Sequence, residues 1–246
     1  MMEIWAVTDV GLVRKENQDA FATLLHEESH CTIGVVCDGM GGAAGGQVAS
    51  RMAVETYLRE VTAHLQPDMT PEQLREVSAY AVSVANRAIW EAAESNPEYR
   101  GMGTTLVSAI SYKGGVVVTN VGDSRAYHIT SSGITRITRD HSLVERMVER
   151  GDITEEEARR HPNRNLITRA LGPDMSALSD GYIHDMASGD FLLLCSDGLV
   201  DTVTDQEMLF EVIHGGELST CVDRLLAIAK AHGAPDNVTV VLMQKR

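Results

Sequence analysis

Three apolar runs of this chain meet an aspartate at one end, and this repetition limits the folds that the chain can adopt. Ile33–Gly42 (IGVVCDGMGG) reaches Asp38 after a short apolar run, and Phe191–Asp201 (FLLLCSDGLVD) reaches Asp197 in the same way. Asp236 stands just before a third apolar run near the C-terminus. Runs of this length are typical of buried strands. One such end is equally well explained by a hairpin turn, in which Asp and Gly are common, but three favour a metal site with oxygen ligands.

The remaining patterns predict strands and helices in separate groups along the chain. Strands are expected at Met2–Val10, around Asp38, and at Thr104–Tyr112, Val116–Val121, Ala126–Thr130, Ile134–Thr138, Gly181–Asp185, Asp190–Cys195 and Val238–Met243. Helices are expected at Gln47–Leu65, from the capping box Thr70–Gln73 to Pro97, after the N-caps Ser142, Thr154 and Thr204, and at Ser219–Ala231. Strands this close in sequence pair antiparallel. The order predicts a single α+β domain over residues 1–246, without a linker rich in Gly, Ser or Pro.

The chain is acidic, with a formal net charge of −14 from 21 basic and 35 acidic side chains. This charge argues against nucleic acid or an anionic membrane surface as the main partner. No apolar run approaches the ~20 residues of a membrane span. The N-terminus also lacks a signal-peptide pattern, so we expect a cytoplasmic protein.

The four cysteines form no CxxC pair, and we interpret them as reduced core residues: Cys31, Cys37, Cys195 and Cys221. Phosphatases with a cysteine nucleophile place an arginine six positions after the thiol, and none of these four cysteines has one there. The nine histidines show no metal-ligand spacing. Cysteine and histidine chemistry is therefore not expected to carry the function.

Four aspartates stand beside Gly or Asn at a strand end or turn: Asp38, Asp123, Asp197 and Asp236. If they converge, two of them ~4 Å apart repel by ~4 kcal/mol at an effective dielectric constant of about 20. Two divalent cations would balance four carboxylates, and oxygen ligands suit Mg²⁺ or Mn²⁺ better than Zn²⁺. Two such cations that share a carboxylate support in-line attack on phosphorus.

Six short motifs, taken together and in order, resemble those of the PPM/PP2C serine/threonine phosphatases. They are RKENQDA at 14–20, DGMGG at 38–42, GMGTT at 101–105, GDSRAY at 122–127, SDGLVD at 196–201 and DNVTVV at 236–241. Each motif alone is weak, but six in order are specific, and they extend from about residue 8 to the C-terminus. The resemblance implies a β-sandwich of two antiparallel sheets flanked by pairs of antiparallel helices, in four layers α-β-β-α.

The resemblance also implies a dinuclear Mn²⁺ or Mg²⁺ site. By similarity, Asp38 bridges the two ions and the carbonyl of Gly39 binds one of them. Asp197 and Asp236 would hold the other ion, and the nucleophile is a water that the ions activate. No phospho-enzyme forms in this scheme.

Further residues acquire roles by the same similarity. Asp123, with Asp197 or Asp201, would hold a third and weaker ion of the kind known in bacterial members. Asp19 would act through a metal-bound water, and Arg14 would bind the phosphate. Residues 142–172 match the flap that lies beside the active site in this family.

Two positions depart from the eukaryotic pattern. Met40 stands where many eukaryotic members have a histidine that is proposed to protonate the leaving group, and bacterial members commonly have methionine there. Gln18 stands where eukaryotic members often have glutamate, which leaves Asp19 as the acid. His141, close to the flap, is interpreted as a structural or surface residue, and Arg164 and Arg169 as solvated surface residues.

The resemblance predicts a bacterial phosphoserine and phosphothreonine phosphatase that opposes Ser/Thr kinases. The alternative is a pseudophosphatase that binds phosphoproteins without turnover, although the retained ligands Asp38, Asp197 and Asp236 argue against it. Expected partners are phosphorylated proteins, including a Ser/Thr kinase, and the protein is expected to be a monomer.

Overall fold

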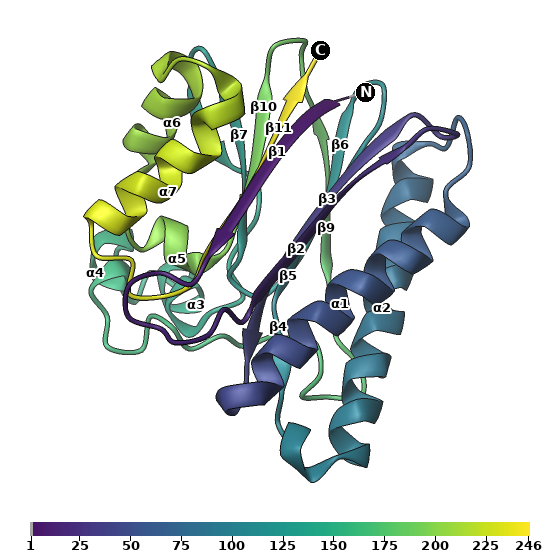
Figure 1. The fold of residues 1–246 in the computed structure, drawn as a ribbon, viewed down its shortest axis with the longest axis vertical. Helices are drawn as coiled ribbons and strands as arrows, with labels where there is room; N and C mark the ends of the chain where they lie inside the picture. Colours follow the sequence, from purple (N-terminus) through teal and green to yellow (C-terminus); the bar gives the residue numbers. More distant parts are fainter. Residues whose placement is uncertain (1) are drawn as a thin grey trace.

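The computed structural model describes residues 2–246, apart from the side chains of residues 42–44. Two sheets pack face to face between two groups of helices (Figure 1). The elements in chain order are β1 (Met2–Asp9), β2 (Asp19–His26), β3 (Cys31–Met40), α1 (Gly42–His64), α2 (Pro71–Ser95), η1 (Pro97–Tyr99), β4 (Gly103–Thr104), β5 (Leu106–Ser111), β6 (Gly115–Val121), β7 (Arg125–Thr130), β8 (Gly133–Arg136), α3 (Leu143–Glu149), α4 (Glu155–Arg159), β9 (Asp180–Asp185), β10 (Phe191–Cys195), α5 (Asp197–Val200), α6 (Asp205–His214), η2 (Leu218–Thr220), α7 (Cys221–Ala231) and β11 (Val238–Lys245).

All strand pairs in the two sheets are antiparallel. The first sheet has the order β1-β11-β10-β7-β8, so the N-terminal strand pairs with the C-terminal one. The second sheet has the order β2-β3-β5-β6-β9, with β4 beside the end of β3. The predicted two-sheet α+β sandwich is therefore confirmed.

The alternation of side chains along each strand produces three separate apolar layers. In β3, Ile33, Val35 and Cys37 pack against α1 and α2, whereas Val36 points to the opposite side and packs between the sheets. In β10, Leu193 packs toward α5, α6 and α7, and its neighbours along the strand pack between the sheets. Figure 1 shows the resulting four layers, with α6 and α7 on one outer side and α1 and α2 on the other.

Most of the predicted helix starts are confirmed by their caps. The hydroxyls of Thr70, Thr154 and Thr204 each accept a bond from the backbone N–H three residues later, and all three form full capping boxes. Ser142 also caps α3. The carboxylate of Glu145 instead accepts a bond from Arg136 at 2.8 Å, so this cap is not a full capping box. The four cysteines are free and buried, as predicted.

Two differences from the predicted elements affect the site. Asp19 is the first residue of β2, a strand that is absent from the elements predicted from the sequence. Helix α1 begins at Gly42, five residues before its predicted start, so it follows β3 almost directly. Because of both differences, β2 and the first turn of α1 lie beside the end of β3, where Asp38 is located. No helix among residues 2–246 combines the length and apolar content that a membrane span requires.

Candidate metal centre

The predicted aspartates gather at one end of the sandwich. A cavity of about 460 Å³ opens there, and its wall contains Asp38, Asp123, Asp197 and Asp236. Arg14, Gly39 and Met40 line the same cavity, together with Gln18, Gly41, Thr105, Asn165, Ile167 and Asn237. Segments from both sheets and from the flap therefore contribute to one site.

Strand register places Asp19 beside Asp38. The two residues are direct partners across the β2–β3 pair. Asp19 Oδ2 accepts hydrogen bonds from the hydroxyls of Ser196 and Thr239, both at 2.7 Å. Because Ser196 and Thr239 belong to the segments of the first sheet, the buried carboxylate of Asp19 joins the two sheets at the site.

Burial and mutual repulsion raise the pKa of these carboxyl groups. Burial raises the pKa of Asp38 and of Asp197 well above its usual value, and the neighbouring aspartates raise it further. Burial likewise raises the pKa of Asp123 to about 7 and that of Asp19 to about 6. So much negative charge in one cavity needs a positive counter-charge if the groups are to stay ionised near neutral pH.

The donor set fits divalent cations. Asp19 Oδ1 and Asp197 Oδ1 are buried without a hydrogen-bond partner, although a buried acceptor normally has one. Asp197 is close enough to Asp38 for the repulsion between the two carboxylates to raise the pKa of Asp38. A hard cation, or a water bound to it, would satisfy such oxygens. In residues 2–246 no three His, Cys, Asp or Glu side chains already stand at the spacing of a metal site, so the carboxylates would have to draw closer together around an ion, and backbone oxygen and water would complete the ligand shells.

Gly39 has no room for a side chain. A Cβ at Gly39 would lie 2.1 Å from the carbonyl oxygen of Gly46 and 2.6 Å from that of Gln18. The backbone N–H of Gly39 also donates to the Gln18 carbonyl at 3.1 Å. Three backbone segments thus converge beside Asp38, and this close approach explains the glycine.

Arg14 reaches the same rim and already has an acidic partner. Its Nη2 donates to Asp236 Oδ2 at 2.6 Å, and this contact raises the pKa of Arg14. Asp197 and Asp38 raise it further at longer range. More than half of the Arg14 side chain is exposed. The guanidinium therefore faces solvent at the cavity mouth while it neutralises one of the four carboxylates.

The two residues expected at a third ion differ in position. Asp123 lies in the cavity wall, in the turn between β6 and β7. Asp201 follows α5 outside that wall, and its Oδ2 lies 3.9 Å from Arg164 Nε of the flap. Arg169, also expected to be solvated, is half-exposed but paired with Asp180 at 2.9 Å.

Sequence reasoning missed the residues that hold these aspartates. Thr105 Oγ1 accepts a bond from the backbone N–H of Asp38 at 2.9 Å and lies 2.7 Å from Ser124 Oγ. Asn237 Oδ1 accepts from the backbone N–H of Gln18 at 2.8 Å. Thr105, Ser124 and Asn237 all stand inside the recognised motifs, and Ser124 and Asn237 directly follow an aspartate, which was the one signal available.

Comparison with known proteins then identifies the family. Residues 13–231 match the family described as protein phosphatase 2C. The chain belongs to that family. The serine/threonine phosphatase stp of Listeria welshimeri is 37% identical over 97% of this chain and 94% of its own length.

Solved structures of the family share the whole fold. Serine/threonine phosphatase Stp1 from Staphylococcus aureus has a TM-score of 0.93 at 37% identity, over 100% of this chain and 96% of that one. The catalytic domain of the serine/threonine protein phosphatase PstP in complex with two manganese ions has a TM-score of 0.83 at 33% identity, over 99% of this chain and 97% of that one. The motif-based recognition of the family is confirmed.

Proposed function

We propose that this chain is a bacterial metal-dependent phosphatase that hydrolyses phosphoserine and phosphothreonine in proteins. The observation that carries the proposal is the convergence of Asp38, Asp197, Asp236 and Asp123 in one cavity, where the buried Oδ1 of Asp197 lacks a hydrogen-bond partner. A guanidinium at the mouth of the same cavity suits a phosphate dianion. The names of the relatives at 37% identity point to the same activity.

The residues that would hold the ions follow from this arrangement. Asp38 would bridge two Mn²⁺ or Mg²⁺ ions, with the Gly39 carbonyl on one ion and Asp197 and Asp236 on the other. Asp123 would hold a third, weaker ion. Asp201, which lies outside the cavity wall, would contribute to that ion less than Asp123 does. When bound, the ions would offset the charge of the phosphate and lower the pKa of the attacking water.

The chain itself supplies binding and orientation. Arg14 would bind two phosphate oxygens after its bond to Asp236 is exchanged for the substrate. Asp19, held by Ser196 and Thr239, is fixed in orientation, and its unpaired Oδ1 can accept a hydrogen bond from a water in the site. Met40 lines the cavity and has no proton to give, so the leaving alkoxide would take its proton from water.

Activity on p-nitrophenyl phosphate and on a phosphothreonine peptide tests the proposal. We expect turnover that requires added Mn²⁺ or Mg²⁺ and stops when the ions are chelated. A protein that binds Mn²⁺ and phosphopeptide but hydrolyses neither substrate would instead be a pseudophosphatase.

We further propose that the substrates are cytoplasmic phosphoproteins, including a Ser/Thr kinase, and that the enzyme acts as a monomer. The formal net charge of −14 supports protein rather than nucleic-acid partners. Dephosphorylation of a kinase isolated from the same cells tests the partner, and light scattering at micromolar concentration tests the monomer.

A further inference from the structure

His141 is a buried histidine that is not among the proposed metal ligands. Its exposed fraction is 6%, and it follows β8 at the point where the chain enters the flap. The backbone N–H of His141 donates to the carbonyl of Gly122 at 2.9 Å. In return, the backbone N–H of Gly122 donates to His141 Nδ1 at 3.0 Å. Since Gly122 directly precedes Asp123, these two bonds fix the backbone from which that carboxylate projects.

The hydrogen bonds of the ring define its tautomer. Nδ1 accepts a hydrogen bond from the backbone N–H of Gly122, so the neutral imidazole carries its own proton on Nε2. Nε2 lies 3.1 Å from Asp180 Oδ2, to which it donates. Arg169 Nη1 is also 3.1 Å from Nε2, and it donates to Asp180 Oδ1 at 2.9 Å. Burial lowers the pKa of His141, which favours this neutral form.

The other side of His141 contacts the flap. Its carbonyl accepts a bond from the backbone N–H of Thr168 at 2.6 Å. The next residues continue this pairing, through a bridge between Ser142 and Ile167 and a bond from Leu143 to Leu166 at 2.8 Å. Ile167 lines the same cavity as the aspartates. One residue is therefore bonded both to the Asp123 turn and to the flap segment that faces the cavity.

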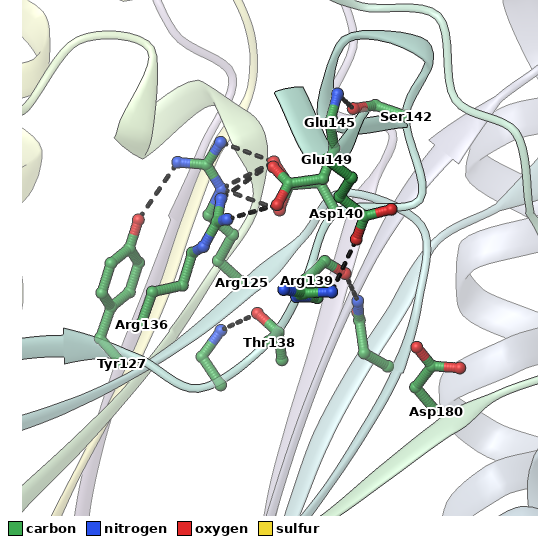
Figure 2. Close-up of polar contacts among 12 residues, drawn as sticks. Arg125, Tyr127, Arg136, Thr138, Arg139, Asp140, Ser142, Glu145, Glu149 and Asp180 are labelled. Carbon is green, nitrogen blue, oxygen red and sulfur yellow. Dashed lines mark hydrogen bonds and ion pairs between the residues drawn. The ribbon is translucent and has the colours of Figure 1, made fainter. Parts of the chain in front are cut away.

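The residue before His141 anchors this junction. Asp140 accepts three bonds from Arg125 at 2.6–3.0 Å, and Arg136 Nη1 lies 3.6 Å from it (Figure 2). Arg136 in turn binds Glu145 of α3 at 2.8 Å. Because Arg125 begins β7, directly after the Asp123 turn, the ion pairs hold residue 140 against that turn, and His141 has little freedom to move independently.

We propose that His141 is a positioning residue, which holds the Asp123 turn and the flap in one relative arrangement through the bond from Gly122 to its Nδ1. The inference rests on the proposed function for its effect on turnover. The bond itself is a property of the fold and does not depend on that function.

Two isosteric substitutions separate the two ring nitrogens. The amide of His141→Asn places an acceptor oxygen near the position of Nδ1, whereas the amide of His141→Gln lies near Nε2. We expect His141→Asn to keep kcat on a phosphothreonine peptide within about threefold of wild type. His141→Gln leaves the buried N–H of Gly122 without an acceptor, and kcat should fall by about tenfold or more. His26→Gln, at the end of β2 away from Asp19, serves as the matched control and should not change kcat.

A second measurement reads the bond without turnover. Long-range ¹H–¹⁵N correlation spectra of the wild-type protein should show His141 with a bare Nδ1 and a protonated Nε2. Amide exchange at Gly122 should be slow in wild type and in His141→Asn, and at least about tenfold faster in His141→Gln. Protonation on Nδ1, or a His141→Gln enzyme as active as His141→Asn with unchanged exchange at Gly122, would overturn the inference. If the wild type had no phosphatase activity, the proposed function would fail, and the spectra and exchange rates would still decide the role of His141.

Discussion

Asp38 is the residue on which the proposed site depends most, and its replacement should separate function from stability. The Asp38→Asn protein should lose activity by several decades, because in the proposed site both ions would lose a charged ligand that no neighbour can replace. It should still fold, since the substitution removes one of several buried, mutually repelling carboxylates. Turnover of p-nitrophenyl phosphate at saturating Mn²⁺ and thermal unfolding in a chelator measure the two effects.

The expected unfolding result has a definite sign. In the chelator, Asp38→Asn should melt at or above the temperature of the wild type, because burial and nearby aspartates disfavour the charged form of Asp38. Retention of more than about a percent of wild-type turnover would remove Asp38 from the metal site. A mutant that melts well below wild type in the chelator would show that Asp38 has a structural role instead.

Arg14 has two possible partners at the cavity mouth, and its substitution should reveal which matters. Arg14→Ala should mainly raise KM, by about ten- to a hundredfold, because a guanidinium binds two phosphate oxygens already in the ground state. Arg14→Lys should recover only part of this loss, since a lysine offers a point charge. Inhibition by free phosphate should weaken in parallel with KM. An Arg14→Ala enzyme with unchanged KM and unchanged phosphate inhibition would mean that the bond to Asp236 is its only role.

The sequence identified the acids of the site more readily than the residues that hold them. Asp38 and Asp197 end apolar runs, so their position at a sheet edge could be predicted from local pattern alone. The partners of Asp19 could not, because Ser196 and Thr239 lie 177 and 220 residues away in sequence. Only the packing of the two sheets brings those hydroxyls to Asp19, and no local pattern reports it.

Among the elements, β2 shows why local pattern was insufficient. It begins with an aspartate, whereas the predicted runs of β3 and β10 lead to one, and it is mostly half-buried or exposed, whereas β3 and β10 are almost entirely buried. Its place is set by pairing with β3 over the full length of β2. The caps of α2, α4 and α6 were predictable because a capping box is closed within four residues.

A pair of histidines joins the two sheets, and it should make stability depend on pH. His184 of β9 lies with Nε2 3.0 Å from Nδ1 of His128 in β7, and His128 Nε2 lies 2.9 Å from Asp190. Burial, and then the proximity of His128, lowers the pKa of His184, although the acidic neighbours Asp185 and Asp190 oppose this. On acidification the unfolded chain therefore takes up a proton at this residue before the folded protein does.

The contribution of His184 to the free energy of unfolding is present above pH ~6.5, the pKa of histidine in the unfolded chain. It is lost as the pH falls below that value. When the pH falls from ~7.5 to ~5.5, the melting temperature of the wild type should decrease more than that of His184→Gln. The difference should be about 1–3 °C, since solvent screens this half-exposed ring. The comparison cancels the effect of the carboxylates at the other end of the sandwich. Equal losses in the two proteins would contradict the lowered pKa.

At the scale of the whole molecule, the central apolar layer connects the two sheets and the metal cavity closes one end of it. Val36 and Val107 of the second sheet pack there against Leu194 and Val241 of the first. The acids come from both sheets, so neither sheet with its helices contains a complete site. We therefore propose that residues 1–246 unfold as one unit and that ions in the cavity stabilise the entire fold.

Calorimetric unfolding with and without Mn²⁺ tests this coupling. In a chelator we expect one transition, because separation of the sheets would expose the central layer on both sides. At a Mn²⁺ concentration of about 100 times the dissociation constant, binding to the folded state alone contributes ~2.7 kcal/mol, which for a chain of this size is about 5–10 °C. Asp38→Asn should show a much smaller shift, and His26→Gln, far from the cavity, should show the full one. Two separate transitions would contradict the single unit. A wild-type transition that Mn²⁺ leaves in place would mean that the carboxylates, although close together, do not hold the ion.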